Sequence, residues 1–179
     1  MQSGIPVYTA FETQTALEVI TGEHTTAISP NKSCQIGSFT VVPFNVPHDT
    51  EIECYGYLIK HEEMGKLLFL TDLEYCKYDF SNQMVNHILC EANYDMQFVN
   101  RDEPNYEHRL RGHMSLDTAL KFISTNDNPA LRNVVLIHLS DKSGGPALFK
   151  QKTEETVKYG ANVYIAEKGL EVDMNLCPF

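Results

Sequence analysis

The chain has 179 residues, of which 42% are hydrophobic, so it is long enough to bury the core of one soluble domain. Its net charge of −10 argues against broad electrostatic capture of nucleic acid, which normally requires a basic face. A substrate with one or two phosphates, held by a metal and a few local cations, is compatible with this charge. We expect a single domain over residues 1–179.

Cysteine usage and the absence of targeting signals predict a cytoplasmic protein. The cysteines are odd in number and form no CxxC pair, which favours free thiols in a reducing compartment: Cys34, Cys54, Cys76, Cys90 and Cys177. The first ten residues, MQSGIPVYTA, lack the basic flank and apolar core of a signal peptide. No apolar run approaches the length needed to span a membrane.

The first half of the chain reads mainly as strands and hairpins. A short strand over residues 5–9 precedes a helix over 12–22 that Gly22 closes, and a polar loop follows over 24–33. Further strands are predicted at about 35–42, 52–60 and 66–71. The last two form a hairpin that turns at Glu62 to Gly65.

In the second half, strands and helices alternate. A strand over 86–91 leads into a polar segment that ends at Gly112, after which Ser115 caps a helix through residues 117–125. The remaining predicted elements are a strand at 134–140, a helix at 146–160 and a strand at 162–169. This order predicts a mixed α/β layered domain.

Three of the apolar, strand-like runs stop at a residue able to bind a metal: His48, Asp72 and His138. Ligand sites of sheet-based folds gather where strand ends meet, so these residues are candidates for one site. Taken singly, each has an ordinary alternative. His48 could be a turn or capping histidine, Asp72 could begin a turn, and His138 could be a satisfied core residue.

A fourth segment adds Glu91 at the end of a strand and His113 ahead of a helix. The positive end of that helix dipole would favour a neutral imidazole at His113, which could then exchange protons. Glu91 could orient it or bond to the backbone. Arg109 and Arg111 flank this histidine and could contact a phosphate or form exposed salt bridges.

The other histidines carry no predicted role. His61 in HEEMG resembles the start of a zinc-protease helix, but no second histidine follows four residues later. His24, His87 and His108 belong to no constellation and are expected on the surface or in packing.

Taken in order, the segments PFNVPHD, FLTDLEY, ILCEANYD, RGHMSLDTA and VVLIHLSD resemble the second half of a metallo-β-lactamase-fold hydrolase. The resemblance covers most of the chain and is closest to the YycJ-like branch, which is similar to the tRNase Z and PhnP phosphodiesterases. It implies an α/β (α+β) fold of the αββα sandwich type. It also implies a dinuclear centre of zinc or manganese that activates water for phosphodiester hydrolysis.

By this resemblance, His48 matches a histidine ligand of one metal, Asp72 the carboxylate that bridges both metals, and His138 the histidine ligand of the second. His113 matches the general acid/base and Glu91 its orienting partner. Arg109 and Arg111 remain candidate substrate contacts.

The family's histidine-rich HxHxDH loop is absent from these 179 residues, and we expect it upstream of the GIPVYTA segment. The chain is therefore expected to form a partial, N-terminally truncated sandwich. An open sheet edge and apolar face would follow, and we expect another copy of the chain or a separate polypeptide to cover them.

Two main functional readings stay open at this point. One is a metal-dependent phosphodiesterase or nuclease that becomes active when the missing ligands are supplied. The other is a catalytically inactive remnant that serves as a binding or interaction module. A β-lactam-hydrolysing enzyme is a weaker third reading, because the EAN and GHMS segments point to the nuclease-like branch.

Overall fold

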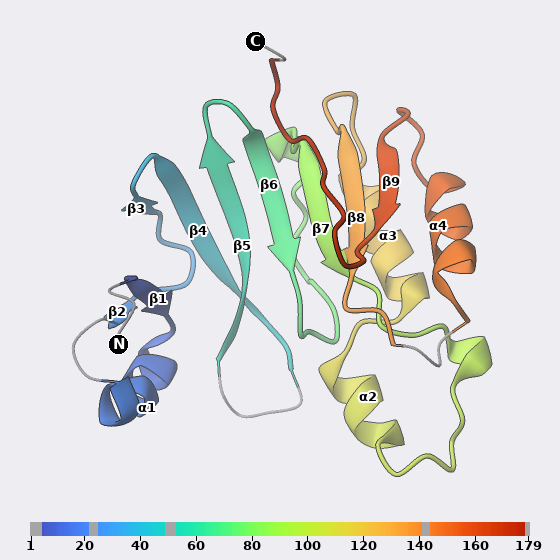
Figure 1. The fold of residues 1–179 in the computed structure, drawn as a ribbon, viewed down its shortest axis with the longest axis horizontal. Coiled ribbons are helices and arrows are strands. Elements are labelled where there is room, and N and C mark those ends of the chain that lie inside the picture. Colours follow the sequence, from blue (N-terminus) through green and yellow to red (C-terminus); the bar gives the residue numbers. More distant parts are fainter. Residues whose placement is uncertain (1–4, 22–24, 49–52, 141–143, 178–179) are drawn as a thin grey trace.

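A seven-stranded mixed sheet forms the centre of the computed structural model, which describes residues 5–21, 25–48, 53–140 and 144–177 (Figure 1). In spatial order, which is also chain order, its strands are β3 (Cys34–Ile36), β4 (Phe39–Val46), β5 (Cys54–His61), β6 (Gly65–Leu70), β7 (His87–Glu91), β8 (Asn133–Ile137) and β9 (Asn162–Ile165). The expected mixed α/β architecture is therefore present.

The two halves of the sheet differ in strand direction because their connections differ. Strands β3 to β6 are antiparallel, with tight turns between β3 and β4 and between β5 and β6, whereas β6 to β9 are parallel and joined through longer crossovers. Parallel strands are buried on both faces, which explains the continuous apolar run of β8. The carboxyl ends of β6, β7 and β8 consequently lie side by side.

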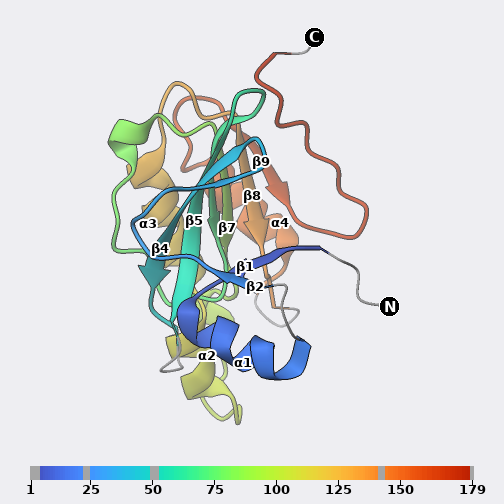
Figure 2. The same cartoon turned by 90° about the vertical axis from the view of Figure 1, so that its left-hand side faces the viewer.

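Helices α3 (Leu116–Asn126) and α4 (Pro146–Glu154) contribute the main core on one face of the sheet (Figure 2). The Ser115 hydroxyl accepts a hydrogen bond from the Thr118 N–H at 3.2 Å, so the predicted helix cap is confirmed. From α3, Leu116, Ala119 and Ile123 are fully buried in this core, which also contains the sheet residues Leu68, Ile88, Cys90, Val134 and Leu136.

A small unit of β1 (Val7–Thr9), α1 (Phe11–Thr21) and β2 (Thr25–Ala27) packs near β5 through Ala10, Ile28 and Tyr55. The prediction of a loop over 24–33 was wrong for Thr25–Ala27, which pairs in parallel with β1. The strand is too short to show an alternating pattern. The predicted helix end at Gly22 lies outside the described residues.

Three other predicted elements need correction. The expected strand at 35–42 is a β3–β4 hairpin, because Gly37 adopts a φ of 59° and reverses the chain. The helix expected over 146–160 ends at Glu154. The polar segment before Gly112 contains a 3-10 turn, η2 (Met96–Phe98), and a helix, α2 (Tyr106–Gly112); another 3-10 turn, η1 (Ser81–Gln83), precedes β7.

The sheet face opposite α3 has less cover. One row of paired residues crosses it from β5 to β9: Tyr57, Phe69, Leu89, Val135 and Tyr164. All except Val135 are half-buried. The segment after β9 crosses in front of β7 and β8 (Figure 1), and it is tied there by a 3.0 Å bond from the Asn133 amide to the Asp173 carbonyl.

Among the described residues, no helix combines the length and the apolar character needed to cross a bilayer.

Candidate metal centre

Three adjacent parallel strands deliver polar side chains to one edge of the sheet. Glu91 is the last residue of β7, Asp72 lies two residues beyond β6, and His138 directly follows β8. Asp72 and His138 both have positive φ angles, of 54° and 58°. Non-glycine residues rarely adopt this left-handed backbone, and such conformations concentrate at functional sites.

Asp72, His113 and His138 form a compact group of potential metal ligands. One donor atom from each lies within 4.8 Å of the other two. The His138 Nδ1 is 3.5 Å from Asp72 Oδ1 and 3.5 Å from Glu91 Oε1, while the Thr71 hydroxyl donates to Asp72 Oδ2 at 2.9 Å. Two imidazoles and a carboxylate make the three-ligand set typical of catalytic zinc sites, which leave a position open.

His113 is oriented by Glu91. Its Nδ1 donates to Glu91 Oε1 at 2.7 Å, and the other carboxylate oxygen accepts the Leu73 N–H at 3.2 Å. Glu91 is completely buried, so both bonds are shielded from water. The structure therefore brings His113 and Glu91 together, as expected for a histidine and its orienting carboxylate.

The helix-dipole argument for a neutral His113 is opposed by the carboxylates nearest to it. The hydrogen bond to Glu91 raises the pKa of His113 above its usual value; burial opposes this rise, while the charges of Glu91 and Asp72 add to it. The nearby carboxylates therefore outweigh the helix dipole. His113 also lies outside the helix that Ser115 caps: its backbone is extended, between α2 and α3.

His48 lies beside the group without joining it. It follows the end of β4, its Nδ1 is 2.8 Å from the Gly112 carbonyl oxygen, and its ring centroid is 5.9 Å from that of His113. A histidine that donates Nδ1–H to a backbone carbonyl keeps Nε2 as an acceptor, as metal ligands commonly do.

Sequence reasoning missed His108. On α2, its ring centroid is 5.9 Å from that of His113 and 6.4 Å from that of His48. The error came from treating residues before Gly112 as an irregular segment. Had a helix been predicted, the spacing of His108 and Gly112, four residues apart, would have placed His108 on the side facing the His113 segment.

The two candidate arginines differ in placement. Arg109 Nη2 bonds to Glu103 Oε2 at 2.9 Å, and only 15% of its side chain is exposed. The Arg111 side chain is 69% exposed and lies 3.9 Å from Glu107 in an ordinary helix-surface pair. Arg111 is not part of the site lining.

A pocket of about 360 Å³ opens next to the candidate ligands. None of the described residues that line it is acidic: Asn93, Asn105, His108, Arg109, His113, His138, Leu139 and Ser140. The Asn93 amide donates to the His138 carbonyl at 2.8 Å, which fixes the strand end behind the ligand.

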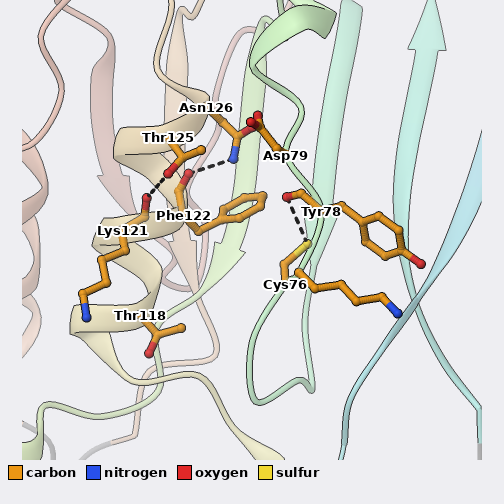
Figure 3. Close-up of a pocket in the computed structure, with 9 residues that line it drawn as sticks. Cys76, Tyr78, Asp79, Thr118, Lys121, Phe122, Thr125 and Asn126 are labelled. Atoms are coloured by element: carbon orange, nitrogen blue, oxygen red, sulfur yellow. Dashed lines mark hydrogen bonds between the residues drawn. The ribbon is translucent and has the colours of Figure 1, made fainter.

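Another pocket, of about 240 Å³, lies between α3 and the segment 76–79 (Figure 3). Its Asn126 is fully engaged, since it accepts from the Phe80 N–H and donates to the Phe122 carbonyl. The Lys121 side chain points away from Cys76 and Tyr78 in Figure 3. This pocket contains none of the candidate ligands.

Comparison with protein-family models gave no match, and comparison with curated protein sequences gave none either. Solved structures do match. The metallo-β-lactamase fold protein YhfI from Bacillus subtilis aligns with a TM-score of 0.67 at 18% identity, over 92% of this chain and 63% of its own. Igni18, a metallo hydrolase from the archaeon Ignicoccus hospitalis, gives 0.69 at 15% identity, over 96% and 69%.

An isothiocyanate hydrolase from Delia radicum gut bacteria also aligns, with a TM-score of 0.65 at 15% identity, over 96% of this chain and 68% of its own. These similarities show that the chain has a metallo-β-lactamase-like fold. They extend over most of this chain but only about two thirds of the longer structures. Because one fold supports many reactions, they do not identify the substrate.

Proposed function

We propose that the chain is a metal-dependent hydrolase of the phosphodiesterase or nuclease type, from the YycJ-like branch of the metallo-β-lactamase fold. The observation that carries this proposal is the convergence of Asp72 and His138, just beyond the ends of β6 and β8, with His113, which precedes α3; their donor atoms lie within 4.8 Å of one another. The buried Glu91 behind His113 supports a chemical role for the group, because burying a carboxylate costs free energy unless it is paired.

Asp72 and His138 would hold a zinc or manganese ion, with His48 as a ligand of a second one. A bound ion would supply an activated water and stabilise charge on the scissile ester. The donor set fits such an ion, since carboxylate and imidazole suit both metals.

The chain's own residues would orient the substrate and move protons. Glu91 holds the His113 ring in place through Nδ1, so its Nε2 is the atom that can give a proton to a leaving group. Arg109, held by Glu103, would bind an anionic oxygen of the ester.

The geometry also permits a second role for His113, as a third metal ligand, because its donor atom belongs to the same close group. The two roles differ in what removal of the side chain does. Loss of a ligand lowers metal affinity, whereas loss of a proton donor lowers turnover and leaves the metal in place.

Metal content separates these roles and tests the proposal. The purified chain, His138→Ala, His113→Gln and the control His61→Ala would be loaded with zinc or manganese, freed of excess and analysed for metal. We expect near-stoichiometric metal in the unaltered chain and in the control, and none in His138→Ala. Metal retained by His113→Gln assigns it to proton transfer; metal lost assigns it as a ligand. Unchanged metal in His138→Ala would refute the site.

We further infer that another copy of this chain, or a separate polypeptide, covers the sheet face that carries Phe69 and Leu89. Supporting this, the row is apolar and mostly half-buried, and about a third of each similar solved structure lies outside its match to this chain. If the purified chain binds no metal, the partner is the place to look for further ligands. A pair of chains that still binds none would favour the inactive binding module.

A further inference from the structure

The pocket beside the candidate metal centre has an unusual charge for this molecule. The chain carries 24 acidic and 14 basic residues, yet the described pocket lining has one arginine, three histidines and no acid. Its polar groups include hydrogen-bond donors from Asn105, Arg109 and Ser140. Such a lining suits an anionic substrate group beside a metal held at Asp72 and His138.

Helix α2 supplies the outer wall of this pocket. Asn105 precedes the helix, and His108 and Arg109 lie within it. Arg109 is held by the 2.9 Å bond to Glu103, and both side chains are mostly shielded, at 15% and 22% exposure. A guanidinium fixed in this way presents its remaining N–H groups at little entropic cost. His108 is exposed, with its ring centroid 6.4 Å from that of His48 and 5.9 Å from that of His113.

We propose that His108 and Arg109 form a subsite for the anionic group of a small substrate, such as a single phosphodiester, and that His108 is a specificity-determining residue. This proposal rests on the proposed hydrolase function and names the substrate class for the same site. His108 contributes a ring N–H to the anion, and Arg109 contributes the charge.

Two features favour a small substrate over a polynucleotide. The pocket volume of about 360 Å³ is near the lower end of ligand sites, which span roughly 300–1,000 Å³. The net charge of −10 would repel a long polyanion. One anionic group with a small organic substituent fits both, whereas an extended strand would need a basic track outside the pocket.

The test is a titration of the full chain, free of metal, with diphenyl phosphate, a small phosphodiester, and separately with a 20-nucleotide single strand. Histidine ring signals in NMR spectra would report binding. The site variants are His108→Ala and Arg109→Lys, and Arg109→Lys also guards against loss of the helix because it keeps the stem and charge. The matched controls are His61→Ala and Arg111→Ala, and Arg111 is the exposed arginine of the same helix.

We expect each site variant to weaken diphenyl phosphate binding about tenfold or more, as for a lost hydrogen bond to a charged group, while both controls bind as the unaltered chain does. Equal losses in Arg111→Ala would mean a diffuse charge effect and would overturn the subsite. Tighter binding of the single strand than of diphenyl phosphate would overturn the small-substrate assignment. The titration uses metal-free chain, so its result does not depend on whether the chain binds metal in the assay proposed above.

Discussion

Asp72 and His138 hold an unfavourable backbone, with φ angles of 54° and 58°, at the two strand ends that carry candidate ligands. An L-residue other than glycine in this conformation costs about 1–2 kcal/mol. The rest of the fold must offset that cost, and the strained backbone sets the direction of the two side chains. A substitution that removes the strain should therefore raise the free energy of unfolding.

His138→Gly and His138→Ala both remove the imidazole, but only glycine adopts the φ of 58° without strain. We expect the glycine variant to have the larger free energy of unfolding, by about 1 kcal/mol, in urea titrations of the two proteins. The pair controls for lost side-chain contacts. An alanine variant as stable as the glycine variant would show that the backbone at this position is relaxed.

His87 predicts a dependence of stability on pH. Burial lowers its pKa below the usual value, and in its neutral form it lies 3.1 Å from the Met64 carbonyl and accepts from the Asn133 amide at 3.0 Å. Its unfolded pKa is about 6.5, so the unfolded chain binds the proton more readily. The stabilising contribution is full above this value and is lost as the pH falls through it toward the folded pKa.

The measurement is the free energy of unfolding of the unaltered chain, His87→Gln and the control His61→Gln, in the β5–β6 hairpin, between pH 7.5 and 5.5. We expect the unaltered chain and the control to lose more stability on acidification than His87→Gln does, by at most about 1.4 kcal/mol per pH unit. His113 has a raised pKa, which makes stability depend on pH in the opposite sense, but it is present in all three proteins, so its contribution cancels in the comparison. Parallel curves would show that His87 titrates normally.

At the scale of elements, an ion pair ties α4 to the loop that follows β7. Lys152 Nζ is 2.7 Å from Asp95 Oδ2, and the Asp95 side chain is only 3% exposed. Burial raises the pKa of Asp95, but the bonds from Lys152 and the Gln97 N–H bring it below its usual value. The loop also contains Asn93, so this pair helps to hold the site lining.

Lys152→Ala leaves the Asp95 charge buried without its partner, and we expect it to lower the free energy of unfolding by about 3 kcal/mol. Lys150→Ala on the same helix is the control, since its pair with Glu154 spans 3.8 Å between side chains that are 50% and 53% exposed. We expect less than about 0.5 kcal/mol there. Similar losses in both variants would show that the helix, and not the ion pair, is affected.

The elements that were predicted correctly from the sequence are those whose pattern of apolar residues is set by burial in the core. Strand β8, with five consecutive apolar or buried positions, and α3, with a serine cap and apolar residues at helical spacing, fall in this class. Helix α2 was missed because its seven residues, YEHRLRG, carry few apolar positions. Its helical form depends on contacts made elsewhere in the fold, which sequence alone does not contain.

The same distinction explains the site. His48, Asp72 and His138 were predicted as one site because strand ends meet at one edge, a rule that needs only the strands. Asp72 and His138 do meet there, whereas His48 lies beside them. His108 was missed because its place depends on the unpredicted α2. The left-handed backbone at Asp72 and His138 likewise has no sequence signal, since glycine, the usual residue there, is absent.

At the scale of the whole molecule, the sheet has one well-covered face and one that is covered only in parts. The unit around α1 packs near Tyr55 and Tyr57, and the segment after β9 crosses β7 and β8. Between them, Phe69 and Leu89 lie half-buried in the middle of the sheet. Apolar side chains in such a row favour association, because another surface would bury them further.

We therefore expect the purified chain to self-associate at micromolar concentration in sedimentation velocity experiments and to bind a dye that reports apolar surface. Phe69→Glu places a charge in the row and should weaken self-association about tenfold or more, since an unpaired charge is costly to bury. Tyr159→Glu, at an exposed apolar position after α4, should leave it unchanged. A monomer that binds no dye would show that the segment after β9 and the α1 unit already cover this face, and that no partner is needed.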